Sequence, residues 1–245
     1  MPFYSNISSY YDYIFPYNEV KKSFALKGFN SAESYTLLDI GCGTGGLALD
    51  LAREGHSVFA IDSDHQMINQ AIAKKMPLSL DEFPVFREFD MRKIHAFFEP
   101  AQFDGIICFG NTLVHLSDKQ EIEDFLRSCS HILKSGGHLK IQILNYDYIL
   151  DYPVEELPHI ETDHIRFERY YEITSPENIE FITHLRIKEE ERTLTSRIHL
   201  YPLRKNDLED LLRRTGFEDI HFYGDFSGNA FQYENLPLLV DAVKS

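Results

Sequence analysis

LLDIGCGTGGLAL, residues 37–49, is the most informative stretch of this 245-residue chain. It starts as an apolar run, passes through Gly41, Gly43 and Gly45, and continues with apolar residues at helical spacing. A strand, a glycine turn and a helix in this order are typical of a ligand-binding loop in a parallel sheet. Glycine permits a positive φ and close approach of the backbone to a ligand. The following helix offers its N-terminal amides to a carboxylate or phosphate.

Strand and helix patterns alternate on both sides of this loop, over residues 36–144. Strands are predicted at 36–40, 57–62, 85–89, 103–109 and 138–144, and helices at 19–29, 46–54, 64–75 and 119–133. This alternation predicts an α/β, Rossmann-like, doubly wound, mostly parallel sheet with helices on both faces. The ligand crevice of such a fold lies at the carboxyl ends of the strands.

The pattern changes after residue 146. Partial period-2 alternation predicts antiparallel strands at 164–173, 179–188 and 192–201. This segment follows directly from the carboxyl end of a strand, so we interpret residues 147–201 as a substrate cap insertion over the crevice rather than an ordinary insertion. A helix at 203–215 and apolar runs at 217–224 and 236–243 bring the sheet to seven strands.

These patterns predict a single domain over residues 1–245. Its parts are an N-terminal lid segment (1–35), a cofactor-binding core (36–144), the cap (147–201) and a C-terminal completion of the sheet (202–245).

Composition excludes several function classes. The 24 Lys and Arg against 39 Asp and Glu give a net charge of −15, which argues against a general nucleic-acid binder or a binder of acidic membranes. Three widely spaced cysteines without a CxxC pair indicate buried thiols in a reducing compartment and no metal site. The sequence shows no signal peptide and no membrane span, so we expect a cytoplasmic protein with a small-molecule substrate. The oligomeric state stays open.

Asp62 ends the second predicted strand, about 20 residues after the glycine loop, where an acid holds a ribose diol. Gly41, Gly43 and Gly46 satisfy GxGxxG, a pattern that serves both dinucleotide and S-adenosylmethionine sites. Asp90 and Met91 end the third strand, where an adenine can be met. The run DGIICFGNTLVHL, residues 104–116, turns sharply after the fourth strand, toward the crevice.

The motif DIGCGTG, with Asp62, Asp90 and the LKSGG turn before HLKIQI, resembles the class I S-adenosylmethionine-dependent methyltransferases over residues 36–144. The resemblance implies S-adenosylmethionine as cofactor and S-adenosylhomocysteine as product. The N-terminal YSNISSYYDYI resembles a lead segment whose tyrosines close over the cofactor. The implied cofactor-binding residues are Tyr4, Tyr11, Gly41, Cys42, Gly43, Asp62, Ser63, Met67, Asp90, Met91, Phe109 and His115.

ICFGNTLVHL, NYDYIL, HLYP and GDF partially resemble the glycine/sarcosine N-methyltransferases. This likeness places Asn111 and Tyr201 near the acceptor. The family has an arginine before the Asn-Tyr pair that grips the carboxylate of glycine, whereas this chain has Leu144. The resemblance therefore does not imply glycine as substrate; Arg166 or Arg169 of the cap are the candidates to replace that arginine.

The expected activity is methyl transfer to a small molecule, with N-methylation favoured over O-methylation. The sulfonium already activates the leaving group, so in-line displacement requires mainly proximity, orientation and desolvation. His115 and His199 are candidate bases, although each is also explained as a structural histidine. Two alternatives stay open: a catalytically silent, cofactor-binding partner subunit, and a nicotinamide-dependent oxidoreductase.

Overall fold

Helices and strands alternate through most of the chain in the computed structural model, which describes residues 2–78, 80, 82–152, 154–175 and 177–245. The N-terminal segment and the core contain α1 (Pro2–Ile7), η1 (Ser8–Tyr10), α2 (Tyr11–Ile14), α3 (Val20–Ala25), β1 (Thr36–Ile40), α4 (Gly46–Arg53), β2 (Ser57–Asp62), α5 (His65–Lys75), η2 (Met76–Leu78), β3 (Val85–Glu88), η3 (Met91–Lys93), α6 (Ile94–Phe97), β4 (Phe103–Cys108), η4 (Leu113–His115), α7 (Lys119–Ile132) and β5 (Leu133–Leu144). The remainder contains α8 (Tyr146–Asp151), β6 (Glu156–Glu161), β7 (Ile165–Ser175), β8 (Asn178–Ile187), β9 (Arg192–Leu200), α9 (Lys205–Arg214), β10 (Phe217–Tyr223) and β11 (Pro237–Lys244).

The described strands form two separate sheets. The larger has seven strands in the order β10-β11-β5-β4-β1-β2-β3. β11 is antiparallel to β10 and to β5, and the other neighbours are parallel. This arrangement confirms the predicted mostly parallel, doubly wound sheet.

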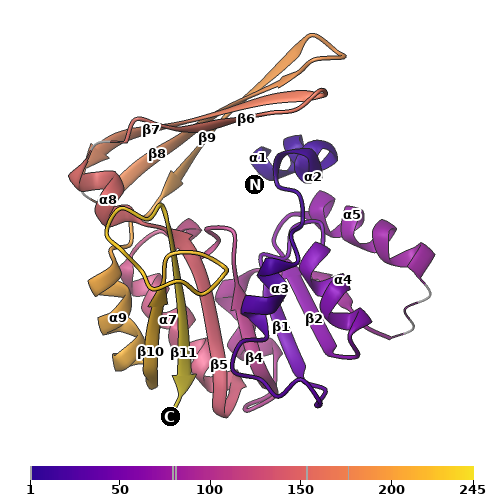
Figure 1. The fold of residues 1–245 in the computed structure, drawn as a ribbon, viewed down its shortest axis with the longest axis vertical. Coiled ribbons are helices and arrows are strands. Elements are labelled where there is room, and N and C mark those ends of the chain that lie inside the picture. Colours follow the sequence, from indigo (N-terminus) through magenta and orange to yellow (C-terminus); the bar gives the residue numbers. More distant parts are fainter. Residues whose placement is uncertain (1, 79, 81, 153, 176) are drawn as a thin grey trace.

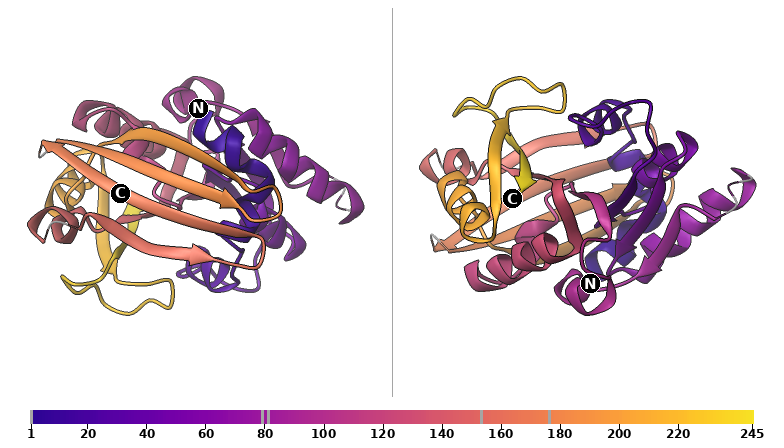
Figure 2. Two further views of the ribbon diagram at one scale, coloured as in Figure 1. Left: turned by 90° about the horizontal axis from the view of Figure 1, so that it is seen from above. Right: turned by 90° about the horizontal axis from the view of Figure 1, so that it is seen from below.

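Both faces of the large sheet are buried. Successive side chains of a strand point to opposite faces, so neighbouring residues of one strand enter different buried clusters. Leu37 of β1 shares a buried cluster with Phe24 of α3, whereas the next residue, Leu38, shares another with Phe125 of α7. Figure 2 shows the helices on either side of the sheet. The near-continuous apolar strands of the sequence follow from this double burial.

The smaller sheet, β6-β7-β8-β9, is fully antiparallel and is called the cap sheet here. It follows β5 and α8 in the chain and lies across one end of the large sheet (Figure 1). The sequence patterns predict β7, β8 and β9 but not β6. That strand carries two acidic residues, a histidine and a proline, and within it only Leu157 is buried, so it has no alternating apolar pattern to detect.

The N-terminal helices α1 and α2, which the sequence does not predict, lie between the cap sheet and the core (Figure 1). α1 contacts α5 and β9, and α2 contacts β7. Ile7 and Ile14 are buried in one cluster with Met67 of α5 and Phe167 of the cap sheet. Helices this short form through tertiary packing rather than through intrinsic propensity.

All three cysteines are unpaired; Cys108 and Cys129 are buried and Cys42 is half-buried. Among the described helices, none combines the length and apolar character needed to cross a membrane.

Candidate active site

The glycine loop between β1 and α4 has a backbone that other residues would strain. Gly41, Gly43 and Gly45 have φ angles of 71°, 54° and 79°. A Cβ at Gly41 would lie 2.4 Å from Oγ1 of Thr112, and one at Gly43 would lie 3.2 Å from the ring of Tyr11. Glycine is therefore required both by the turn and by the close approach of neighbouring segments.

Asp62, at the end of β2, is fixed against this loop. Its Oδ2 accepts the Gly43 N–H at 2.9 Å, and its Oδ1 accepts the Asp64 N–H at 2.9 Å. Burial raises the pKa of Asp62, while the two backbone amides act in the opposite direction. A carboxylate offers about four acceptor positions, so both oxygens can still accept bonds from a vicinal diol.

A cavity of about 270 Å³ lies beside the glycine loop; we call it the glycine-loop cavity. Ten of the twelve predicted cofactor-binding residues line it, namely Tyr4, Tyr11, Gly41, Gly43, Asp62, Ser63, Met67, Asp90, Met91 and His115. The lining also contains six residues that the sequence does not predict as site residues, namely Ile40, Ile61, Phe89, Arg92, Gly110 and Thr112. Strands β1, β2, β3 and β4 all end here, so the sheet topology brings most of these residues together, while Tyr4, Tyr11 and Met67 come from helices. Their role in binding remains a prediction.

Cys42 and Phe109 line a smaller cavity of about 70 Å³ on the other side of the loop. Lys21 and Asp39 also line it, and neither was predicted as a site residue. Burial raises the pKa of Asp39 to about 7 and lowers that of Lys21. Asp39 could have been found from the sequence, since it lies two residues before Gly41, whereas Lys21 lies in a helix without a motif.

A further cavity of about 290 Å³ lies under the cap sheet; we call it the cap cavity. It shares Tyr4, Tyr11, Gly110 and His115 with the glycine-loop cavity. Its other lining residues are Phe15, Lys21, Asn111, Gln142, Leu144, Leu157, Arg169, Tyr171, Phe181, Ile198, Leu200, Asp225, Phe226 and Pro237.

Two of the predicted acceptor residues, Arg169 and Asn111, line the cap cavity. Asn111 lies in the loop after β4. Its Oδ1 accepts the Leu144 N–H at 2.9 Å, and its Nδ2 donates to the Tyr146 hydroxyl at 2.9 Å, so this amide shapes the wall. The structure brings neither Tyr201 nor Arg166 into the lining. Arg166 pairs with Glu168 at 2.8 Å on the outer face of β7.

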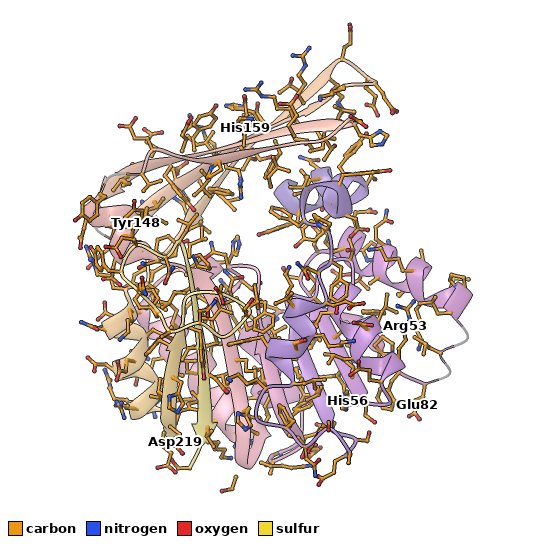
Figure 3. The ribbon with its side chains drawn as sticks, in the orientation of Figure 1. Arg53, His56, Glu82, Tyr148, His159 and Asp219 are labelled. Carbon is orange, nitrogen blue, oxygen red and sulfur yellow. The ribbon has the colours of Figure 1, made fainter. Side chains whose placement is uncertain are left out.

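Alternation along β7 explains why Arg169 lines the cavity and Arg166 does not. Ile165, Phe167 and Tyr171 are buried on the inner face, and Arg169 has the same parity. Arg166 has the opposite parity and faces away. Figure 3 shows the outer surface of the cap sheet at His159, and the junction of cap and core at Tyr148.

Tyr4 and His115 meet at the junction of the two cavities, with Tyr4 Oη 2.9 Å from His115 Nε2. Burial lowers the pKa of His115 to about 4, so the imidazole is neutral at pH 7. Its Nδ1 is buried, and no described residue forms a hydrogen bond with it. The other histidine considered as a base, His199, lies on the cap sheet and is paired with Glu180 at 3.0 Å, outside the lining of either cavity.

The N-terminal segment that carries Tyr4 and Tyr11 is fastened over the core by polar contacts. Thr44 Oγ1 donates to Asp12 at 2.7 Å, and Lys74 forms an ion pair with the same carboxylate at 2.5 Å. Ser5 donates to Asp64 at 2.5 Å. The segment thus forms one wall of both cavities.

A methyltransferase domain family model matches residues 37–137. The glycine/sarcosine/dimethylglycine N-methyltransferase of Actinopolyspora halophila is 29% identical over 225 residues, which cover 85% of this chain but only 36% of that protein. The glycine/sarcosine N-methyltransferase of Aphanothece halophytica is 26% identical over 206 residues, covering 83% of this chain and 74% of that protein.

Solved structures share the fold over the whole chain. The crystal structure of an S-adenosylmethionine-dependent methyltransferase from Clostridium acetobutylicum matches with a TM-score of 0.81 at 17% identity, over 99% of both chains. In the sequence of its core and in its fold, the chain is therefore similar to the class I S-adenosylmethionine-dependent methyltransferases, enzymes with S-adenosylmethionine as cofactor, and it partially resembles the glycine/sarcosine N-methyltransferases.

Proposed function

We propose that this protein transfers a methyl group from S-adenosylmethionine to an amine nitrogen of a small molecule. The observation that carries the proposal is the meeting of the glycine-loop cavity with the cap cavity at Tyr4, Tyr11, Gly110 and His115. A cofactor in the first cavity and an acceptor in the second would therefore face each other across this junction.

The linings of the glycine-loop cavity and of the smaller cavity beside it together fit the cofactor group by group. The buried Asp62 carboxylate suits the ribose diol, and Asp90 with Met91 suits the adenine end. Lys21 and Asp39, one cation and one acid, suit the carboxylate and the ammonium of the methionine end. Gly41 and Gly43 leave room for the backbone to approach the ligand.

When bound, the cofactor supplies a methyl group on a sulfonium, whose positive charge already activates the leaving group. The protein then has to align the acceptor, exclude water and leave the nucleophile unprotonated. The α1–α2 segment and the cap sheet enclose the junction from two sides. Tyr4 and His115, held by their hydrogen bond, form a fixed wall there.

The electrostatics at the junction favour nitrogen over oxygen as the acceptor atom. Burial among Leu157, Phe181, Ile198 and Leu200 disfavours an ammonium and so favours the neutral, nucleophilic amine. A hydroxyl would need a general base. His115, with its pKa lowered to about 4, is a weak base, because its environment disfavours protonation. The relatives named as N-methyltransferases support the same choice.

The test uses matched small molecules that differ only in an amine or a hydroxyl, incubated with S-adenosylmethionine. We expect S-adenosylhomocysteine to form with amines and not with the matched alcohols, and the amine to gain one methyl group by mass spectrometry. Turnover of the alcohols instead would overturn the choice of nitrogen. Cofactor binding without turnover across the panel would favour the silent partner subunit.

A further inference from the structure

Arg169 and Tyr171 form a polar pair in the otherwise apolar cap-sheet wall of the cap cavity. They are two residues apart on β7 and share its inner face. Arg169 lies opposite Thr183 of β8, and Tyr171 lies opposite Phe181, with ring centroids of the latter pair 5.4 Å apart. The strand register therefore fixes where both polar groups sit.

Only part of the hydrogen-bonding capacity of the Arg169 guanidinium is used. Its Nη2 donates to the Pro158 carbonyl at 2.6 Å, whereas its Nε is buried and has no hydrogen-bond partner in the part of the chain that the structure describes. No carboxylate among the described residues forms an ion pair with it. Burial also lowers the pKa of Arg169. A half-buried cation without a counter-charge loses part of its hydration, so the site favours binding of an anion.

Tyr171 presents a second unused donor beside the guanidinium. The residue is 6% exposed, and its hydroxyl is buried without a hydrogen-bond partner among the residues that the structure describes. Buried hydroxyls are normally paired in native proteins. An unpaired hydroxyl and an unpaired guanidinium N–H on one wall of a cavity are the groups that bind a carboxylate.

We propose that Arg169 and Tyr171 anchor a carboxylate of the methyl acceptor, which is therefore an amine with an apolar body and an acidic group. The inference rests on the proposed function, and it identifies the substrate class of the same site. The anchor lies on the cap sheet. Position 144, at the end of β5, lines the same cavity but is a leucine, which cannot bind a carboxylate.

The rest of the cap-sheet wall defines the body of the acceptor, whereas the polar lining residues Lys21, Asn111, Gln142 and Asp225 come from the core. Leu157, Phe181, Ile198 and Leu200 surround the anchor with apolar surface. One guanidinium balances one carboxylate, whereas a phosphate carries more charge than this wall neutralises. Arg169 lines neither the glycine-loop cavity nor the smaller cavity beside Lys21, so it is available to the acceptor rather than to the cofactor.

The test measures the binding of phenylacetate, 3-phenylpropionate and 4-phenylbutyrate against the alcohols of the same length, by calorimetry, with and without S-adenosylhomocysteine. None of these probes carries an amine, so the result does not depend on methyl transfer. We expect at least one acid to bind about ten- to hundredfold more tightly than its alcohol, the range for a hydrogen bond to a charged group. Affinity for S-adenosylhomocysteine itself reports separately on the proposed function.

Two variants of one strand supply the matched comparison. Arg169→Met should abolish the preference for the acid, whereas Arg166→Met on the outer face should retain it. Tyr171→Phe, which keeps the ring and its packing, should reduce the preference several-fold. This variant tests the proposal independently if the Arg169 variant does not fold. Equal binding of every acid and its alcohol, or a preference that survives in both Arg169→Met and Tyr171→Phe, would overturn the proposal.

Discussion

The Tyr4 hydroxyl lies 2.9 Å from Nε2 of His115 and joins the N-terminal segment to the loop after β4. The two residues are 111 positions apart in the chain, and the contact lies where the glycine-loop cavity meets the cap cavity. One of the contacts that hold the N-terminal segment on the core is therefore made by a neutral imidazole.

Burial of His115 makes the stability of the fold depend on pH. Its pKa falls from 6.5 to about 4. Between these values the unfolded chain binds a proton that the folded chain does not, so the stabilisation is complete above pH 6.5 and is lost as the pH falls toward 4. The full effect is about 3 kcal/mol in the free energy of unfolding.

His115→Gln should remove this dependence. We expect the difference in unfolding free energy between wild type and variant to shrink steadily from pH 6.5 to 4, as measured by urea titration at each pH. Asp39, whose pKa is raised to about 7, contributes the opposite slope to both proteins and cancels in the difference. A difference that stays constant over this range would mean that His115 is not kept neutral by burial.

Asp62→Asn should weaken binding of S-adenosylhomocysteine about ten- to hundredfold, because a bond from a diol to a charged acceptor contributes about 1.5–3 kcal/mol. Glu99→Gln is the control, since this exposed acid precedes β4 at the opposite end of the sheet. Calorimetric titration measures both. Unchanged affinity in the Asp62 variant would remove this residue from the cofactor site.

A comparison of Gly41→Ala with Gly55→Ala separates the cost of backbone strain from the cost of a steric conflict. Both positions have left-handed φ angles, of 71° and 91°. The new Cβ at Gly41 would lie 2.4 Å from Thr112 Oγ1, whereas nothing lies within 4 Å at Gly55. Backbone strain alone lowers the free energy of unfolding by about 1–2 kcal/mol. The steric conflict should lower that of the Gly41 variant by roughly a further 1–3 kcal/mol, and its affinity for the cofactor should fall as well. Equal losses in thermal unfolding would contradict the predicted conflict with Thr112.

Lys21→Met should distinguish two adenosine ligands. The Lys21 side chain lines the cavity beside Asp39, where we place the amino-acid end of the cofactor. Affinity for S-adenosylhomocysteine should fall about ten- to hundredfold. Affinity for 5′-methylthioadenosine, which lacks the amino-acid end, should be unchanged. An equal decrease for both ligands would indicate a general disturbance of the loop instead.

The sequence predicts the large sheet well, because both of its faces are buried and its strands are therefore continuously apolar. Strand β6 escapes prediction, since within it only Leu157 is buried. Helices α1 and α2 escape for another reason. They are short, and packing of Ile7 and Ile14 against α5 and the cap sheet holds them in place, which local sequence does not show.

The residues of the candidate site also fall into a group that the sequence predicts and a group that it does not. Gly41, Gly43, Asp62 and Asp90 are predicted because a parallel sheet brings the ends of its strands together. Lys21 reaches the site from α3, without a motif. Prediction of the inward face of β7 requires its strand register, and this explains why the sequence leaves Arg166 and Arg169 as equal candidates, while the structure places only Arg169 in the cavity lining.

The most direct measurement is the thermal unfolding of the protein with S-adenosylmethionine, S-adenosylhomocysteine and NAD in turn. A ligand at about 100 times its dissociation constant adds about 2.7 kcal/mol. For a domain of this size this is a rise of roughly 5–11 °C in Tm. We predict such a rise with both adenosyl compounds and none with NAD. A rise with NAD alone, or none with either adenosyl compound in folded, ligand-free protein, would contradict the assignment of the glycine-loop cavity.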